Sequence, residues 1–172
     1  MPSRERLPVD GRAGPGAGAS THGGAVSFHA ATPADADALA SLRVAAMRES
    51  LERVGRFDEA RARARLLDAF DAQLTTVIHV DGALAGFFVV RPSPDGLLLD
   101  HLYIHPRHQG RGLGALVLGH LFALADARQV TVRVGALRES DSNRFYLRHG
   151  FVPAGTSAFD NHYLRVPAKA GG

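Results

Sequence analysis

The chain has 172 residues, the length of one ordinary domain. It contains no cysteine, which excludes disulfide-stabilised scaffolds and cysteine-based zinc or iron–sulfur sites. The net charge is only +3, and because Lys169 is the single lysine, arginine carries nearly all of the positive charge. This balance gives little support to nucleic-acid binding and suits a protein with a site for an anionic ligand.

The first 25 residues hold six of the 19 glycines, three of the nine prolines and no run of large apolar side chains. Such a segment cannot bury enough surface to fold, so we expect a disordered tail at 1–25. It has no apolar segment of a secretory signal, and the longest nearly apolar stretch, 113–125, is shorter than the roughly 20 residues that cross a bilayer. We therefore expect a cytoplasmic protein whose partners include neither a membrane nor a nucleic acid.

A strand and two helices are predicted to follow the tail. Thr32 is the expected N-cap of the first helix, because Pro33 occupies the first helical position and Asp35 lies in the first turn. Asp58 is the expected N-cap of the second helix. The predicted ranges are 26–30 for the strand and 33–52 and 59–71 for the helices.

The remaining chain alternates strands with two further helices. Asp81-Gly82 is a strong two-residue hairpin turn, Pro106 ends a leucine-rich strand, and Gly150 is the expected left-handed residue after the last helix. The element order is β-α-α-β-β-β-α-β-α-β-β, without an internal repeat or linker. The predicted strands are 75–80, 84–91, 97–105, 130–137, 151–153 and 159–166, and the predicted helices open at 110–114 and 141 and end near 128 and 149.

The segment 109–115 joins a strand to a helix and contains three glycines. Because glycine has no Cβ, the backbone N–H groups of such a loop can converge on one ligand, and the start of a helix favours an anion. A diphosphate fits this arrangement, with Arg107 or Arg111 as a further charge contact. A P-loop is excluded, since the lysine that follows the last glycine of that motif is missing.

Two other interpretations of this loop stay open. Gly110-x-Gly112-x-x-Ala115 also matches the G-x-G-x-x-A fingerprint of dinucleotide-binding proteins, with Glu139 beyond the next strand as a ribose contact. A glycine-rich turn that binds no ligand would also have this composition. The pattern alone therefore does not decide between these interpretations.

A further pattern in the loop resembles a known family. Gln109-x-x-Gly112-x-Gly114 has the [QR]-x-x-G-x-[GA] pattern of the GNAT superfamily of acyl-CoA-dependent N-acyltransferases, and the Y-x-x-x-G-F run at 146–151 resembles its other common mark. The element order is similar as well, so the resemblance covers 26–166. It implies an α/β (α+β) fold, a mixed twisted sheet of about six to seven strands flanked by about four helices, with a flexible C-terminus at 167–172.

The resemblance implies that acetyl-CoA is the cosubstrate and that no metal takes part. The pantetheine arm would lie in a V-shaped split between strands 97–105 and 130–137, and the pyrophosphate would meet the amides of the glycine loop. The residues expected to contact acetyl-CoA are Leu102, Tyr103, Ile104, Gln109, Gly110, Arg111, Gly112, Leu113, Gly114, Ala115 and Asn143.

The chemistry needs two proton transfers. An amine with a pKa of about 10.4 must lose a proton before it attacks a thioester, and the departing thiolate must gain one. The resemblance implies that Tyr146 protonates the sulfur. Asp100 is the expected base, acting through water, with His101 or no dedicated residue as alternatives. The two-residue period of a strand places Asp100 on one face with Leu102, and His101 on the other face with Tyr103.

Two further clusters of side chains do not indicate a functional site. His101 and His105 lie roughly 13 Å apart along a strand, too far to share a metal ion. Arg61, Arg63 and Arg65 do not share one helical face, which indicates a solvated helix surface rather than a nucleic-acid site. The G-x-S-x-G motif of serine hydrolases does not occur in the sequence.

We expect the first two helices and their loop to form the acceptor pocket, with Arg48 or Arg56 holding an acceptor carboxylate. The predicted function is transfer of an acetyl group from acetyl-CoA to a primary amine of a small molecule or peptide, by direct attack in a ternary complex. A CoA-binding regulatory module without turnover and a nicotinamide-dinucleotide-binding protein are the alternatives. The identity of the acceptor stays open. Homodimers are common among similar proteins, although no segment here specifies an interface.

Overall fold

The computed structural model describes residues 24–53 and 55–171. The tail predicted at 1–25 lies outside the described residues except for its last two, and Ala25 exchanges two hydrogen bonds of 2.9 Å with Asp81. At the other end, Ala168 donates to Asp126 at 2.8 Å and accepts from the side chain of Gln129 at 2.9 Å. The segment predicted to be flexible is thus held at Ala168. No helix among the described residues is long and apolar enough to span a membrane.

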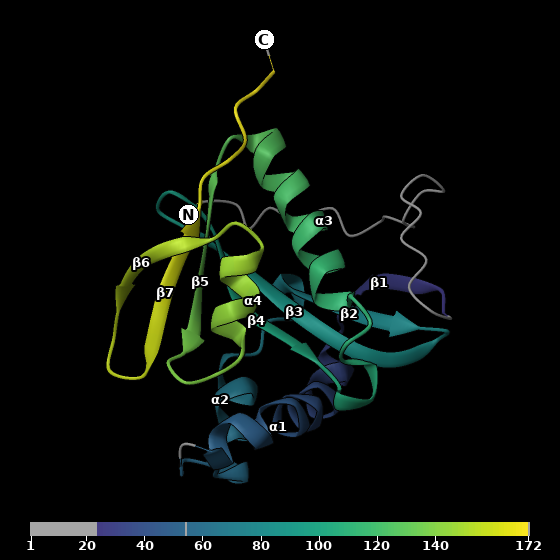
Figure 1. Cartoon of the computed structure of the whole chain (residues 1–172). Coiled ribbons are helices and arrows are strands. Elements are labelled where there is room, and N and C mark those ends of the chain that lie inside the picture. The colour runs from purple at the N-terminus through teal and green to yellow at the C-terminus, as the bar shows by residue number, and fades with distance from the viewer. Residues whose placement is uncertain (1–23, 54, 172) are drawn as a thin grey trace.

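The elements follow the predicted order, with boundaries shifted by a few residues (Figure 1). Both predicted helix starts are capped: Asp35 accepts from the Thr32 N–H at 2.8 Å, and Asp58 accepts from the Arg61 N–H at 3.0 Å. The elements are β1 Val26–Ala30, α1 Ala36–Arg53, α2 Glu59–Ala69, β2 Thr75–Val80, β3 Ala83–Ser93, β4 Gly96–Ile104, α3 Leu113–Arg128, β5 Thr131–Leu137, α4 Ser142–Arg148, β6 Val152–Thr156 and β7 Asp160–Arg165.

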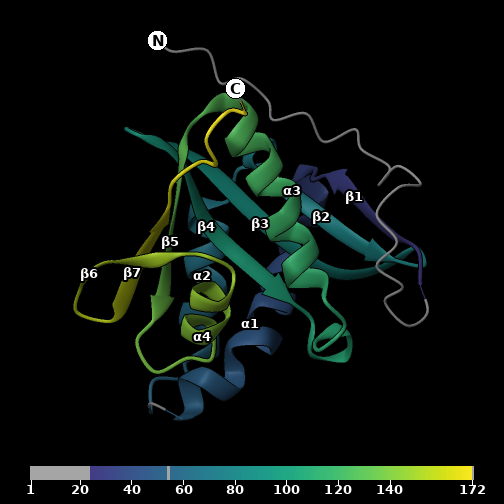
Figure 2. The same ribbon diagram turned by 45° about the horizontal axis from the view of Figure 1, so that its top comes forward.

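The seven described strands form one mixed sheet in the order β1-β2-β3-β4-β5-β7-β6. Every neighbouring pair is antiparallel except β4 and β5, which are parallel and are connected through α3. Figures 1 and 2 show α3 and α4 on one face of the sheet and α1 and α2 on the other. This is the mixed sheet flanked by four helices that the resemblance implied.

Apolar side chains fill both faces of the sheet. On one face Val117 and Leu121 of α3 pack in the same core as Leu99 of β4, and all three are fully buried. On the other face Leu39 of α1 and Phe87 of β3 belong to a second core. Because helices cover both faces, the middle of the sheet excludes water, and the burial of these side chains drives the two layers together.

The parallel pair β4–β5 is joined over only part of its length. Its ladder ends at the pair Leu99–Val134, although β4 continues to Ile104 beside β3. The closed end is clamped by Arg133, whose Nε lies 3.0 Å from both carboxylate oxygens of Asp95 and whose Nη2 lies 2.6 Å from one. Beyond the ladder, β5 pairs only with β7. The two strands therefore separate toward their carboxyl ends, as the resemblance implied.

A β-bulge changes the face on which Asp100 lies. Val89 pairs with His101 and Val90 pairs with Leu99, so Asp100 is left without a partner on β3. The extra residue interrupts the two-residue period, and Asp100 lies on the same side of the sheet as His101. The sequence-based prediction that Asp100 shares the opposite face with Leu102 is therefore wrong. Side chains alternate strictly between the two faces of a sheet only where the pairing register of the strands has no bulge.

Candidate active site

The glycine loop has the backbone geometry that its composition predicts. Gly110 and Gly112 adopt positive φ angles of 74° and 78°, and α3 begins directly after Gly112. No acceptor is recorded, within the described part of the chain, for the backbone N–H groups of residues 110–115. These amides lie directly before and within the first turn of a sixteen-residue helix. The loop therefore offers several free donors and the positive end of a helix dipole to an anion.

Side chains fix this loop against the end of β4. The Gln109 side-chain amide donates to the Ile104 carbonyl at 3.0 Å, and His105 Nδ1 accepts from the Arg107 N–H at 3.1 Å. Gly114 packs so closely against α4 that a Cβ at this position would lie 2.9 Å from Phe145 Cζ. The loop thus touches both the strand that precedes it and the helix that carries the predicted catalytic tyrosine.

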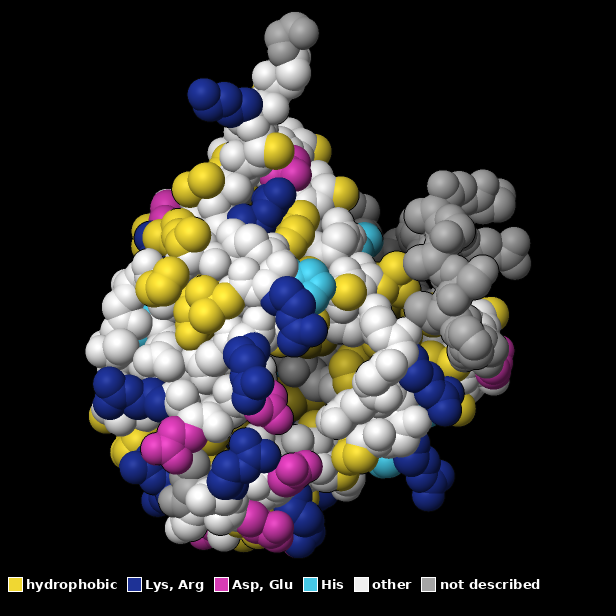
Figure 3. Space-filling model, in the orientation of Figure 1, with side chains coloured by type: hydrophobic (Ala, Val, Ile, Leu, Met, Phe, Trp, Pro, Cys, Tyr) yellow, Lys and Arg dark blue, Asp and Glu magenta, His cyan; other side chains and the backbone are white. Residues whose placement is uncertain are grey.

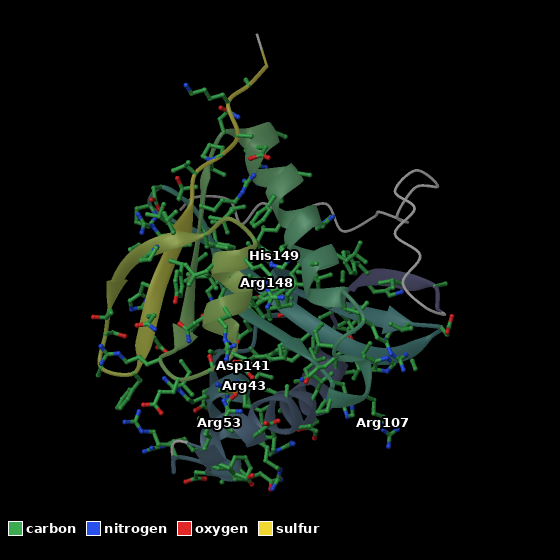
Figure 4. All side chains as sticks on the ribbon, viewed as in Figure 1. Arg43, Arg53, Arg107, Asp141, Arg148 and His149 are labelled. Atoms are coloured by element: carbon green, nitrogen blue, oxygen red, sulfur yellow. The ribbon has the colours of Figure 1, made fainter. Side chains whose placement is uncertain are left out.

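The surface is hollowed between the end of β4 and α4, on the face that α3 covers (Figure 3). Figure 4, in the same orientation, places Arg148 and His149 above this hollow, Asp141 to its left and Arg107 farther to the right. Both arginines are exposed. Arg148 and Arg107 therefore lie on two sides of this hollow, and Asp141 places a negative charge on its rim.

Tyr146 lies in the core beside this hollow. Its ring packs edge-on against Phe151 and Phe145, with centroids 5.4 and 5.3 Å apart, and only 6% of the residue is exposed. Burial raises the pKa of the Tyr146 hydroxyl well above its usual value, and the nearby Tyr103 adds to the rise. No hydrogen bond of this hydroxyl to another described residue is recorded. The group therefore stays protonated at neutral pH.

The side chain of Asn143 is hydrogen-bonded to other residues of the protein. Its side-chain amide group lies within hydrogen-bond distance of the Leu137 and Ser140 carbonyls, both at 2.8 Å, and its carbonyl oxygen accepts from Asn161 and from the Tyr163 hydroxyl. These bonds hold the turn between β5 and α4 against β7. The geometry favours this structural role over the predicted contact with acetyl-CoA, which stays a prediction.

A cavity of about 900 Å³ lies on the face covered by α1 and α2, beyond the gap between β4 and β5. Both strands line it past the end of their ladder, so it opens onto the gap. Its walls come from α1, α2 and the loop between them, from β4 and β5, and from the start of β7. The polar residues that line it are Arg43, Arg56, Asp58, Arg61, Arg65, Asp100, His101, Tyr103, Asp160 and His162.

A chain of polar contacts runs along the β4 wall of this cavity. Arg43 Nε donates to the Tyr103 hydroxyl oxygen at 3.4 Å, and that oxygen lies 3.4 Å from His101 Nδ1. His101 Nε2 lies 3.6 Å from an Asp100 carboxylate oxygen, which also accepts from Arg91 Nε at 2.6 Å. The two residues predicted as alternative bases are thus brought together, and Arg91 holds the carboxylate of Asp100.

The environment of His101 keeps its ring neutral. Burial, against the opposing charge of Asp100 and together with the charges of Arg43, Arg91 and Arg65, lowers the pKa of His101 to about 4. At pH 7 one ring nitrogen therefore carries a free electron pair. The side chain is 15% exposed, which leaves it in contact with the cavity. Within the described residues no group of three or more histidine or acidic side chains is placed to hold a metal ion.

The predicted acceptor arginines are only partly in place. Arg56 lines the cavity and stacks on Phe159, 4.1 Å from the ring centroid. Arg48 does not line the cavity and stacks on Phe57 instead, 4.5 Å from its centroid. The sequence analysis did not identify Arg43 as a site residue. Its spacing within α1 does not show that the side chain is buried beside the cavity. Its burial at 5% exposure follows from the packing of α2 across α1.

Comparisons with known proteins agree with this geometry. A family model described as "Acetyltransferase (GNAT) domain" matches residues 71–153. No curated protein sequence matches the chain.

Many solved structures resemble the fold. The PaiA N-acetyltransferase of Thermoplasma acidophilum, solved in complex with coenzyme A, superimposes with a TM-score of 0.69 at 14% identity over 82% of this chain and 98% of that one. The ribosomal-protein-S18-alanine N-acetyltransferase of Escherichia coli has a TM-score of 0.61 at 18% identity over 85% and 96% of the two chains. A GCN5-related N-acetyltransferase of Rhodopseudomonas palustris has a TM-score of 0.60 at 23% identity over 84% and 96%.

Proposed function

We propose that the chain is an acyltransferase of the GNAT superfamily and that it transfers the acetyl group of acetyl-CoA to a primary amine by direct attack in a ternary complex. The observation that carries this proposal is the separation of β4 from β5 beyond Leu99 and Val134. That gap joins the glycine loop on one face of the sheet to the cavity on the other. A long thiol cosubstrate and an amine can therefore approach one reacting centre from opposite faces.

The glycine loop suits the pyrophosphate of the cosubstrate. The free amides of 110–115 and the start of α3 favour a doubly charged group, and Arg107 and Arg111 lie exposed beside them. The edge of β4 at Leu102, Tyr103 and Ile104 has no partner on β5, so its backbone groups suit the pantetheine amides.

Tyr146 is the proposed general acid. The attack forms a carbon–nitrogen bond and breaks the carbon–sulfur bond of the thioester, and the departing sulfur needs a proton. Burial keeps the Tyr146 hydroxyl protonated until that charge develops. The hydroxyl has no recorded partner among the described residues, so donating its proton breaks no existing contact.

The pair of His101 and Asp100 is the proposed proton acceptor. Arg91 Nε lies 2.6 Å from the Asp100 carboxylate, so this carboxylate is already engaged in an ion pair. The ring of His101 is neutral at pH 7 and lies between Asp100 and Tyr103. His101 therefore takes the amine proton through water, and Asp100 serves as a positioning residue that orients the ring.

Titration of the purified protein with acetyl-CoA tests the binding half of this proposal. We expect saturable binding to the wild type and its loss in Gly112→Glu, because the variant places a carboxylate among the loop amides and strains a positive φ. Gly119→Glu is the matched control, since Gly119 is exposed on the same helix with open space around it. Competition with NADPH separates this assignment from a nicotinamide-dinucleotide site.

Release of free CoA thiol in the presence of a library of primary amines tests the catalytic half. Turnover that requires both an amine and acetyl-CoA supports the proposal. Absence of acetyl-CoA binding by the wild type, or binding that Gly112→Glu retains, contradicts the assignment of the loop. Binding without turnover on any amine would instead point to a regulatory module.

A further inference from the structure

We propose that the amine accepted by this enzyme is a small molecule that carries an oxyanion, a carboxylate or a phosphate, bound by Arg61 and Arg65 of α2 together with Arg43 of α1. This inference rests on the proposed function, because it names the chemical class of the acceptor for the same cavity. It goes against the sequence-based interpretation of the α2 arginines as a solvated surface.

The first observation is that the arginines of α2 lie on different faces of the helix. Arg61 and Arg65 are one helical turn apart and both line the cavity. Neither side chain has an ion pair or a hydrogen bond within the described part of the chain. Arg63, between them, turns toward α1 and bonds Asp37 at 3.2 Å and Ser41 at 2.7 Å. Of these three arginines of α2, the two that face the cavity are thus the ones without an ion-pair or hydrogen-bond partner for the side chain in the described part of the chain.

The second observation is a buried cation in the same cavity. Arg43 is 5% exposed and lies where α1 meets the sheet (Figure 4). Its guanidinium donates to the Ala62 carbonyl and to the Tyr103 hydroxyl, both neutral acceptors, and no carboxylate lies within ion-pair distance of it among the described residues. A buried charge without a counter-ion is costly, and an anionic ligand would supply one.

The acidic residues of the cavity do not neutralise these arginines. The Asp58 carboxylate caps α2 by accepting from the Arg61 backbone N–H, and Asp100 is paired with Arg91. Asp160 lines a different wall, formed by β7. The α2 wall therefore attracts an oxyanion, while the carboxylate of Asp160 on another wall suits the ammonium group of the incoming amine.

The size of the cavity selects the kind of acceptor. A volume of about 900 Å³ lies within the range of sites that enclose small molecules. Guanidinium groups bind carboxylate and phosphate oxygens in pairs of charge-assisted hydrogen bonds. The same groups repel polyamines and other acceptors that carry only positive charge. An amino acid or an aminoalkyl phosphate has both the size and the charge that the cavity requires.

Matched amines test this inference. The panel pairs γ-aminobutyrate with butylamine and with 3-aminopropylphosphonate, pairs β-alanine with propylamine, and adds glutamate and spermidine. The initial rate of CoA thiol release gives kcat/KM for each amine on the wild type, on the double variant Arg61→Gln/Arg65→Gln, and on Arg63→Gln. The last variant removes one charge from the same helix without touching the cavity.

We expect the wild type to prefer the anionic member of a pair by at least about tenfold. The double variant should lose about tenfold to a hundredfold in kcat/KM toward anionic amines, mainly through KM, and little toward butylamine. Arg63→Gln should keep the wild-type preference, and Arg65→Lys should keep part of it. Thermal melting of each variant verifies the fold, which the exposed positions of Arg61 and Arg65 favour.

Preference for the phosphonate over the carboxylate would support the inference with phosphate as the source of the oxyanion. Equal or better turnover of butylamine or spermidine would overturn it, while acetyl transfer itself would stand. Turnover of peptides alone would also overturn it. Failure of every amine despite saturable acetyl-CoA binding would instead overturn the proposed function, and the inference with it.

Discussion

His101 Nδ1 lies 3.4 Å from the hydroxyl oxygen of Tyr103 on the wall of the cavity. The same oxygen accepts from Arg43 Nε at 3.4 Å, and the second ring nitrogen of His101 lies 3.6 Å from an Asp100 carboxylate oxygen. This contact links a buried arginine on α1 to the proposed proton acceptor on β4. It also explains why several properties of the site should change together when one of these groups is altered.

Tyr103→Phe should remove the hydroxyl contacts with Arg43 and His101 while the aromatic ring stays packed. The ring still packs on Phe87, whose centroid is 5.5 Å away, but Arg43 loses its hydroxyl acceptor inside the protein. We expect the free energy of unfolding to fall by about 1–2 kcal/mol, because a partly buried hydrogen bond to a charged group is lost. Urea unfolding at pH 7 measures this change. A variant as stable as the wild type would show that the contact contributes nothing.

The lowered pKa of His101 predicts a pH-dependent stability. The unfolded chain takes up this proton near pH 6.5 and the folded protein only near pH 4, so the free energy of unfolding should fall as the pH drops from about 6.5 to 4. This one group accounts for about 3 kcal/mol over that window. His101→Gln does not titrate and should lose less stability. Urea unfolding at several pH values compares the slopes, and equal slopes would contradict the burial of a neutral ring.

Tyr146→Phe separates catalysis from folding. The phenol ring stays packed between Phe145 and Phe151, and the lost hydroxyl has no recorded partner among the described residues, so stability should change little. If Tyr146 is the general acid, kcat should fall by about a hundredfold while the affinity for acetyl-CoA stays unchanged. Steady-state kinetics beside a binding titration make the comparison. Unchanged kcat would leave Tyr146 as a core residue only.

Asn143→Ala should act on stability rather than on cofactor binding. The substitution removes the donors to the Leu137 and Ser140 carbonyls and leaves Asn161 and Tyr163 without their shared acceptor. We expect a loss of about 2–4 kcal/mol in unfolding free energy, since several partly buried hydrogen bonds are broken at once.

Ser142→Ala is the control for that variant, because Ser142 is exposed at the preceding helical position. Its stability should be close to that of the wild type. If Asn143→Ala instead keeps its stability and loses affinity for acetyl-CoA, the side chain contacts the cosubstrate, as the sequence resemblance implied.

Two glycines of α3 predict changes of opposite sign. A Cβ on Gly114 would lie 2.9 Å from Phe145 Cζ, so Gly114→Ala forces the ring to move and should destabilise the protein by about 1 kcal/mol. Gly119 has open space around it, so Gly119→Ala should stabilise the helix by about 0.5–1 kcal/mol. Thermal unfolding measures both, and equal shifts would contradict the close packing of α3 on α4.

Local signals in the sequence were sufficient for the elements and for the glycine loop. Thr32, Asp58 and Gly112 act through residues within a few positions of themselves, as a cap bonds its own first turn and a glycine sets its own φ angle. For the same reason the order of strands and helices was predictable residue by residue.

The side of the sheet on which Asp100 lies, the burial of Arg43 and the bonds of Asn143 depend on segments far away in the chain. A bulge exists only in the register between two strands, and Arg43 is buried only because α2 crosses α1. The sequence by itself predicted the family resemblance and a glycine loop with free amides that suit an anion. Only the tertiary structure decided which arginines and carboxylates meet in the cavity, because those contacts join residues that no local pattern relates.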